Sequence, residues 1–152
     1  MGFQLQYGNP EIRYIGEANT QTFVAGDLVY LSSGLVTINA ADATIFGVAQ
    51  ATSKADSLNR PTPVSVINTS QTWVAESNAA QTAANVGEDY DVVITTANTA
   101  VNVGSTDNPA VCVVDLDPRD GAVTASGGRL LVKFLPGVLQ QAKGYGTSIL
   151  TT

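Results

Sequence analysis

Short segments rich in Val, Ile, Leu and Thr recur along this chain, and Gly, Pro, Asn or Ser residues separate them. Their spacing of roughly ten residues is typical of a β-barrel or a β-sandwich. The clearest segment is 129–134, where Leu130, Val132 and Phe134 alternate with Arg129 and Lys133. This alternation predicts an antiparallel strand that buries Val132 and Phe134 and turns the two basic residues to the other face. We therefore expect a mainly β protein, a single compact antiparallel β-barrel or sandwich.

The remaining elements follow from the same patterns. A hairpin is expected with strands at 28–31 and 35–38 and a turn between them. Further strands are expected at 43–51, 59–67, 71–77, 90–97, 99–103 and 109–116. Segment 77–90 is rich in alanine, with Ser77 or Asn78 in the position of a cap and Gly87 near its end, and it predicts one short helix.

The N-terminal segment 1–17 has two interpretations. Phe3, Leu5 and Tyr7 alternate with glutamines, which predicts a short strand, and a Gly-Asn-Pro break follows it. This strand is either the first strand of the β domain or an N-terminal arm that adds to a neighbouring subunit. On the arm interpretation, six apolar side chains form the partner interface: Phe3, Leu5, Tyr7, Ile12, Tyr14 and Ile15.

The length of 152 residues suits one domain. We assign 18–139 to the β domain. The polar, glycine-containing residues 140–152 are expected to form a flexible C-terminal tail.

Acidic residues outnumber basic ones by 13 to 7, which gives a net charge of −6. The basic residues are scattered and form no stripe that could neutralise phosphates, so we expect no nucleic-acid partner. Anionic membranes would repel the acidic chain, and no apolar run approaches the roughly 20 residues of a membrane span. The N-terminus shows no signal peptide, so we expect synthesis in a cytoplasm and no membrane association.

Three aspartates, Asp115, Asp117 and Asp120, follow the strand expected at 109–116. A helix-loop-helix calcium loop needs a glycine at its sixth position and a glutamate at its twelfth. Counted from Asp115, these positions hold Asp120 and Ser126. The Pro and Gly of the same stretch suit a tight turn, so we expect a turn and assign no metal site.

The chain contains no histidine, which removes Ser-His-Asp and Cys-His arrangements and the common histidine-containing zinc sites. The single cysteine, Cys112, lies in an apolar run that would raise the pKa of its thiol, so we expect a core residue and not a nucleophile. Glu88, Asp89 and Asp91 lie where the expected helix meets a strand, a common place for solvated charges. We therefore assign no catalytic residue and no cofactor, and we expect a protein that is not an enzyme.

Two short motifs point to a family. Ala25-Gly26-Asp27 with Val29 begins the expected hairpin, and Gly47-Val48-Ala49 lies in the next expected strand. In this order and spacing they resemble the opening of small bacteriophage capsid cement, or head-decoration, proteins. Segments 83–93 and 127–137 are also similar to phage structural proteins, and the resemblance covers roughly residues 18–136.

The resemblance implies a virion structural protein that binds the major capsid protein on the outside of an icosahedral phage head. It would form trimers, bridge neighbouring subunits and stabilise the capsid, after synthesis in the host cytoplasm. One alternative is a phage tail or head-tail connector component. Another is a non-catalytic ligand- or carbohydrate-binding β module with Tyr30, Trp73 and Tyr90 as platforms, although burial habits favour a core position for Trp73.

Overall fold

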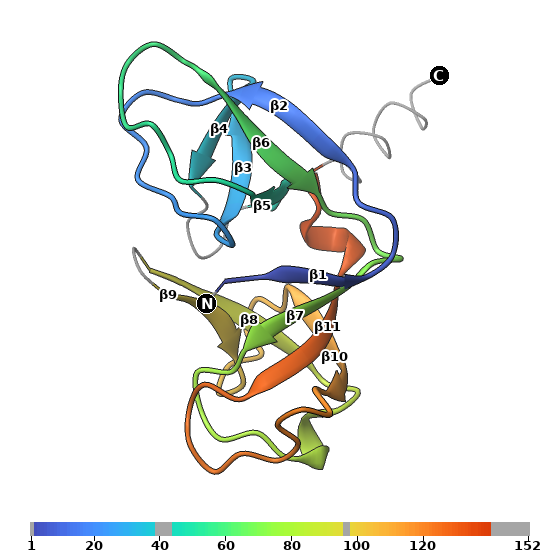
Figure 1. Cartoon of the computed structure of the whole chain (residues 1–152). Helices are drawn as coiled ribbons and strands as arrows, with labels where there is room; N and C mark the ends of the chain where they lie inside the picture. Colours follow the sequence, from blue (N-terminus) through green and yellow to red (C-terminus); the bar gives the residue numbers. More distant parts are fainter. Residues whose placement is uncertain (1, 39–43, 96–97, 141–152) are drawn as a thin grey trace.

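The computed structural model describes residues 2–38, 44–95 and 98–140. Over these residues the chain forms two antiparallel sheets, drawn in the lower and upper halves of Figure 1. The six-stranded sheet has the order β1-β7-β11-β10-β8-β9, with bounds Gln4–Tyr7, Thr72–Glu76, Arg129–Phe134, Val111–Leu116, Asp89–Thr95 and Asn98–Asn102. The five-stranded sheet has the order β2-β6-β5-β3-β4, with bounds Ile12–Gly16, Pro61–Val66, Gly47–Ala49, Leu28–Ser32 and Leu35–Ile38. The predicted mainly β, antiparallel fold is confirmed.

Each sheet curls so that strands far apart in its order approach one another. In the five-stranded sheet, Glu17 directly after β2 forms a bridge to Val36 of β4. In the six-stranded sheet, Ser77 directly after β7 forms a bridge to Val101 of β9. Because each contact is a single bridge and not a ladder, neither sheet closes into a barrel. The architecture is sandwich-like, the second of the two predicted forms.

Strand β11 follows the predicted alternation. Val132 and Phe134 are buried, with exposed fractions of 0% and 2%. Arg129 and Lys133 lie on the opposite face and are half-buried, because β11 is flanked on both sides by β7 and β10. The predicted register of this strand is therefore confirmed.

The predicted hairpin is formed by β3 and β4. Ser32 pairs with Leu35, so the connecting loop contains only Ser33 and Gly34. Both loop residues have positive φ, 52° and 79°, as a type I′ turn requires.

The described residues form two apolar cores, and the larger one joins the two sheets. The larger core contains Trp73 and Phe134, whose ring centroids are 6.2 Å apart in an edge-on arrangement, and Leu28 and Val48 of the five-stranded sheet join it. The smaller core, with Phe23 and others, lies on the opposite face of the five-stranded sheet. Burial on both faces explains why neighbouring residues of β3, Leu28 and Val29, are both apolar and both fully buried.

The helix predicted at 77–90 is wrong. The described residues contain no α-helix, and this segment has one 3₁₀ turn, Ala83–Asn85, capped by Thr82 and not by Ser77 or Asn78. Ser77 forms a β-bridge to Val101, and Gln81 forms one to Val123. Because these residues pair in an extended conformation, the backbone before Thr82 does not form a helix. Tertiary pairing thus overrides the helical propensity of the alanines.

The first and the last described residues both contact the sheets. β1 pairs with β7 of its own chain, as the first-strand interpretation describes. At the other end, the side-chain amide of Gln140 accepts a hydrogen bond from the Leu31 backbone N–H (2.8 Å) and donates one to the Leu31 carbonyl (2.9 Å). Gln140 is therefore anchored, and the rest of the predicted tail, 141–152, lies outside the described residues.

The Ala25-Gly26-Asp27 motif joins the two sheets. Gly26 has φ +98°, and its carbonyl accepts a hydrogen bond from the Phe3 N–H at 2.9 Å. A Cβ on Gly2 would lie 2.2 Å from the Gly26 oxygen, so these two segments of the chain approach to a distance that only glycine permits. The buried Asp27 carboxylate accepts hydrogen bonds from the Val24 N–H (3.0 Å) and from the Thr99 hydroxyl of β9 (3.0 Å).

Candidate partner interface

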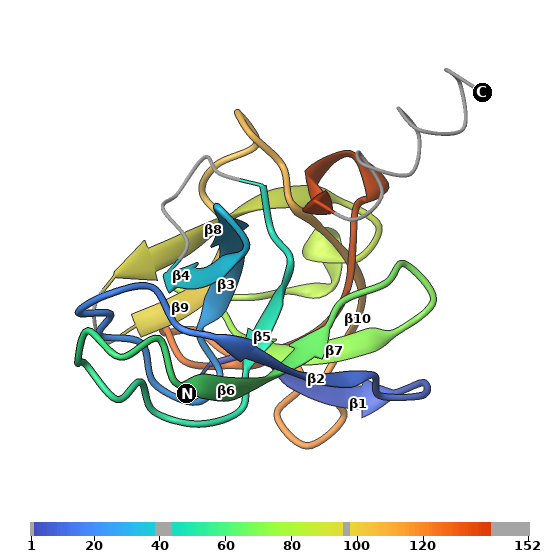
Figure 2. The same cartoon turned by 90° about the horizontal axis from the view of Figure 1, so that it is seen from above.

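Strands β1 and β2 are consecutive in the chain but end different sheets. β1 is the edge of the six-stranded sheet and β2 is an edge of the five-stranded sheet. In Figure 2 both lie on the same side of the molecule. This arrangement places two strand edges, and the side chains on them, next to one another.

The structure divides the six predicted interface residues into two groups. Tyr7, Ile12 and Tyr14 are exposed, with exposed fractions of 60%, 45% and 73%. Phe3 is only 1% exposed and its ring centroid lies 5.2 Å from that of Phe134. Phe3 therefore belongs to the core and leaves the candidate interface.

The other two predicted residues, Leu5 and Ile15, are half-buried. Leu5 packs against the larger core and Ile15 against the smaller one. Their strands alternate between core and solvent, and these two side chains lie on the core side. The candidate interface at the surface is thus Tyr7, Ile12 and Tyr14.

Strand register extends this surface across the five-stranded sheet. Tyr14 is paired with Pro63 of β6, and the Pro63 carbonyl accepts a hydrogen bond from the Gln50 N–H at 3.0 Å. Tyr14, Pro63 and Gln50 therefore form one cross-strand row on the same face. Ile12 starts the neighbouring row, which continues through Ser65 to the buried Val48.

The charges close to this row neutralise each other. Arg13 Nε lies 2.6 Å from Glu11 Oε2, and both side chains are about half exposed. Because side chains alternate along a strand, Arg13 points to the opposite face from Ile12 and Tyr14. The Tyr14–Pro63–Gln50 row itself carries no charge.

The loop between β1 and β2 is fixed by Gln71. Its buried amide donates a hydrogen bond to the Asn9 carbonyl (2.9 Å) and accepts one from the Asn68 N–H (3.0 Å). Gly8, at φ +111°, lets the chain pass close to Gln71. These contacts hold Tyr7 in place relative to β2.

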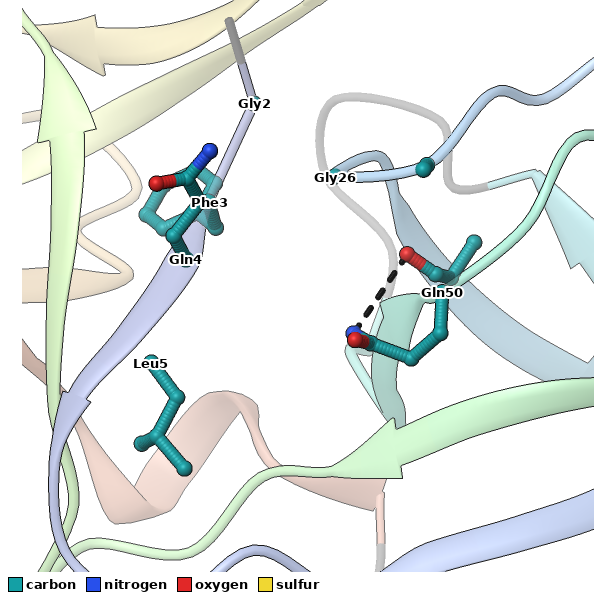
Figure 3. Close-up of a pocket in the computed structure, with 8 residues that line it drawn as sticks. Gly2, Phe3, Gln4, Leu5, Gly26 and Gln50 are labelled. Atoms are coloured by element: carbon teal, nitrogen blue, oxygen red, sulfur yellow. Dashed lines mark hydrogen bonds between the residues drawn. The ribbon is translucent and has the colours of Figure 1, made fainter.

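A groove of about 390 Å³ lies along the start of β1. Its walls come from both sheets: Gly2, Phe3, Gln4, Leu5, Ala25, Gly26, Ala49 and Gln50. Figure 3 shows Gly2 to Leu5 on one side of the groove and Gly26 and Gln50 on the other. The groove connects to the Tyr14 row through Gln50.

The sequence did not reveal this groove. Its residues come from three separate segments, and neither composition nor periodicity shows that these segments meet. The available signal was the pair of close-approach glycines, Gly2 and Gly26, but their contact is visible only in the fold.

Of the three aspartates predicted to lie in a turn, Asp117 and Asp120 do so, between β10 and β11, whereas Asp115 belongs to β10 itself. Asp117 is buried, and both of its carboxylate oxygens accept hydrogen bonds from Arg119 Nε, at 2.9 and 3.1 Å. Asp120 forms a two-pronged pair with Arg129, through Nε at 2.7 Å and Nη2 at 2.8 Å. Asp115 is exposed on β10.

These pairs set the charge state of the turn. Hydrogen bonds from Arg119 lower the pKa of Asp117, and burial opposes them. Hydrogen bonds from Arg129 lower the pKa of Asp120 to about 2. Within the described part of the chain, no group of three or more His, Cys, Asp or Glu residues is placed to hold a metal ion.

Cys112 on β10 is half-buried and not fully buried as predicted. Burial and the neighbouring Asp89 carboxylate raise the pKa of its thiol above the usual value. A raised pKa keeps the sulfur protonated, the form that is a poor nucleophile.

The aromatic residues of the ligand-binding alternative are mostly inside the protein. Trp73 is 0% exposed, which confirms its predicted core position, and Tyr90 is 7% exposed. Tyr30 is half-buried. Near Tyr90, the Asp91 carboxylate accepts hydrogen bonds from the Ser105 hydroxyl (2.7 Å) and the Asn108 N–H (2.9 Å).

Comparison of the sequence with models of known protein families and with curated proteins finds no match. Across the described residues, none of the helical segments has the length and apolar character needed to cross a membrane.

Proposed function

We propose that this chain is a virion structural protein that binds the outside of an icosahedral phage head. It contacts the major capsid protein, bridges neighbouring subunits and stabilises the capsid without catalysis or a cofactor. After synthesis in the host cytoplasm it acts on the capsid exterior, as a trimer, and binds neither nucleic acid nor membrane. The observation that carries the proposal is the surface formed by Tyr7, Ile12 and Tyr14 on two neighbouring edge strands.

Exposed tyrosines on a fixed backbone suit protein binding. Tyrosine is enriched at interface hot spots, because its ring gives a large contact area and its hydroxyl keeps a polar partner. The side chain of Tyr14 is 73% exposed, so its ring has little contact with the rest of the chain. Copies bound around a symmetric head would add their modest individual contributions.

The two motifs of the family resemblance also have physical roles in the fold. Gly26 and Asp27 connect the sheets. A Cβ on Gly47 would lie 2.5 Å from the Ser65 carbonyl oxygen, so β5 needs glycine there to approach β6. Both glycines thus serve the packing of the fold.

A phage tail or head-tail connector component is the second candidate, and the same exposed edge strands support it. The carbohydrate-binding alternative has less support, because Trp73 and Tyr90 are buried. The two phage locations differ in the particle that the chain binds.

The test is binding of the purified chain to heads of the encoding phage that were assembled without it, measured by co-sedimentation. We expect saturable binding, and we expect Tyr14→Ala to weaken it by about 2 kcal/mol, roughly thirtyfold, as removal of an interface hot spot does. Val86→Ala is the control at an exposed apolar residue outside the candidate interface. Val86 is 39% exposed and directly follows the 3₁₀ turn between β7 and β8. Absence of binding to heads, with binding to purified tails or connectors instead, would favour the second candidate.

A further inference from the structure

The groove beside β1 exposes backbone as well as side chains. The Phe3 N–H points away from β7, because it donates to the Gly26 carbonyl across the groove end. Backbone groups alternate in direction along a strand, so the N–H and carbonyl of Leu5 point the same way, into the groove. Among the described residues no strand covers this edge of β1.

The walls of the groove leave these backbone groups accessible. Gly2 and Gly26 have no side chains, and Ala25 and Ala49 have small ones. An open strand edge with small neighbours is the arrangement that accepts an added strand. A compact ligand would fill the volume but leave the directional groups of Leu5 unpaired.

The chemistry of the groove restricts what can enter it. None of its eight lining residues is charged, and its polar side chains are the amides of Gln4 and Gln50. A charged side chain placed there would lose water without gaining an opposite charge, which is costly. The uncharged groove therefore suits a segment that itself carries no charge.

We propose that this groove binds an extended, uncharged segment of the capsid protein, which adds as a strand to the outer edge of β1. The inference rests on the proposed function and specifies its partner. The segment pairs with the Leu5 backbone, its side chains contact Gln4 and Gln50, and the Tyr14 row continues the contact across β6. Tyr14 and the groove then form one continuous interface.

The test introduces one negative charge on β1 inside or outside the groove. Gln4 and Gln6 are both exposed residues of β1 and share a face, but only Gln4 lines the groove. We expect Gln4→Glu to weaken binding to undecorated heads on the order of tenfold, because the carboxylate is buried without a partner. Gln6→Glu, the control, should bind like the unmodified chain, and thermal melting checks that both variants fold.

Each outcome decides a different point. If both variants bind like the unmodified chain, or if both weaken equally, the groove is not the binding site, whereas the proposed function stands. If the unmodified chain does not bind heads, the proposed function fails and this inference fails with it.

A second measurement needs no variant. Hydrogen exchange of the unmodified chain, free and bound to heads, reports on the Leu5 amide directly. We expect this amide to exchange more slowly in the bound state, because strand addition gives it a hydrogen-bond acceptor. An unchanged rate at Leu5, together with protection at Tyr14, would contradict strand addition while leaving head binding intact.

Discussion

The segments of β1 and β2 have similar sequence patterns but differ in how far their large side chains are buried. Both are short edge strands with alternating large apolar side chains, yet Phe3, directly before β1, is buried and Tyr14 of β2 is exposed. The inner face of β1 meets the aromatic core of the six-stranded sheet, where Phe134 contacts Phe3. The outer face of β2 meets solvent. The same alternation of apolar and polar residues thus places a side chain in the core at β1 and an exposed side chain on the surface at β2.

Replacing Phe3, the buried residue directly before β1, should have the largest effect. Phe3→Ala should lower the free energy of unfolding by about 3–5 kcal/mol, because it leaves a cavity beside Phe134. Phe3→Leu, which keeps much of the apolar volume, should cost less. Urea denaturation measures both, and an unchanged stability of Phe3→Ala would mean that β1 is an arm and not a core strand.

Asp27 tests the connection between the sheets that carry β1 and β2. Asp27→Ala leaves the Val24 N–H and the Thr99 hydroxyl without their acceptor, which should cost about 1–3 kcal/mol. Asp27→Asn keeps one carbonyl oxygen and should lose less. Equal stability of the two variants in urea denaturation would show that the hydrogen bond from Thr99 to Asp27 does not hold the sheets together.

Acid should weaken the sheet of β1 through the turn before β11. The pKa of Asp120 is lowered from 3.8 to about 2 by Arg129, so its pair stabilises the fold fully above the ordinary value. This contribution is lost as the pH falls from about 4 toward about 2, where the folded carboxylate takes up its proton. The Tm of the unmodified chain should therefore fall over this range more than the Tm of Asp120→Asn. Parallel Tm curves for the two proteins would contradict the assignment.

The exposed residue of β2 should have the smallest effect on stability. Tyr14→Ala should change the free energy of unfolding by no more than about 0.5 kcal/mol, because its ring has little contact within the chain. The same urea series measures it. A loss as large as that of Phe3→Ala would place Tyr14 in the core and remove the difference between the two strands.

The sequence predicted the strands well where the alternation was strong. In β11, Val132 and Phe134 are buried as expected, and the turn of the β3–β4 hairpin lies where its Ser and Gly indicate. The helix at 77–90 failed because the bridges of Ser77 and Gln81 depend on residues far away in the chain. Local propensity contains no information about such partners.

The candidate site was predicted only in part. Tyr7, Ile12 and Tyr14 are exposed, but Phe3 and Tyr14 could not be distinguished from alternation alone, since both look like one face of a short strand. Which face meets the core depends on the sheet that the strand joins. The groove depends on the meeting of β1, residues 25–26 and residues 49–50, which is a property of the tertiary fold.

Cryo-electron microscopy of the encoding phage's heads, with the chain bound, would show directly which face of the molecule contacts the capsid. We expect density for this fold on the head exterior, with Tyr14 and the groove beside β1 facing the capsid. We also expect density for an extended capsid segment alongside β1. Density that contacts the capsid through the opposite side of the molecule, with Tyr14 in solvent, would contradict the interface. Heads without any such density would contradict the proposed function itself.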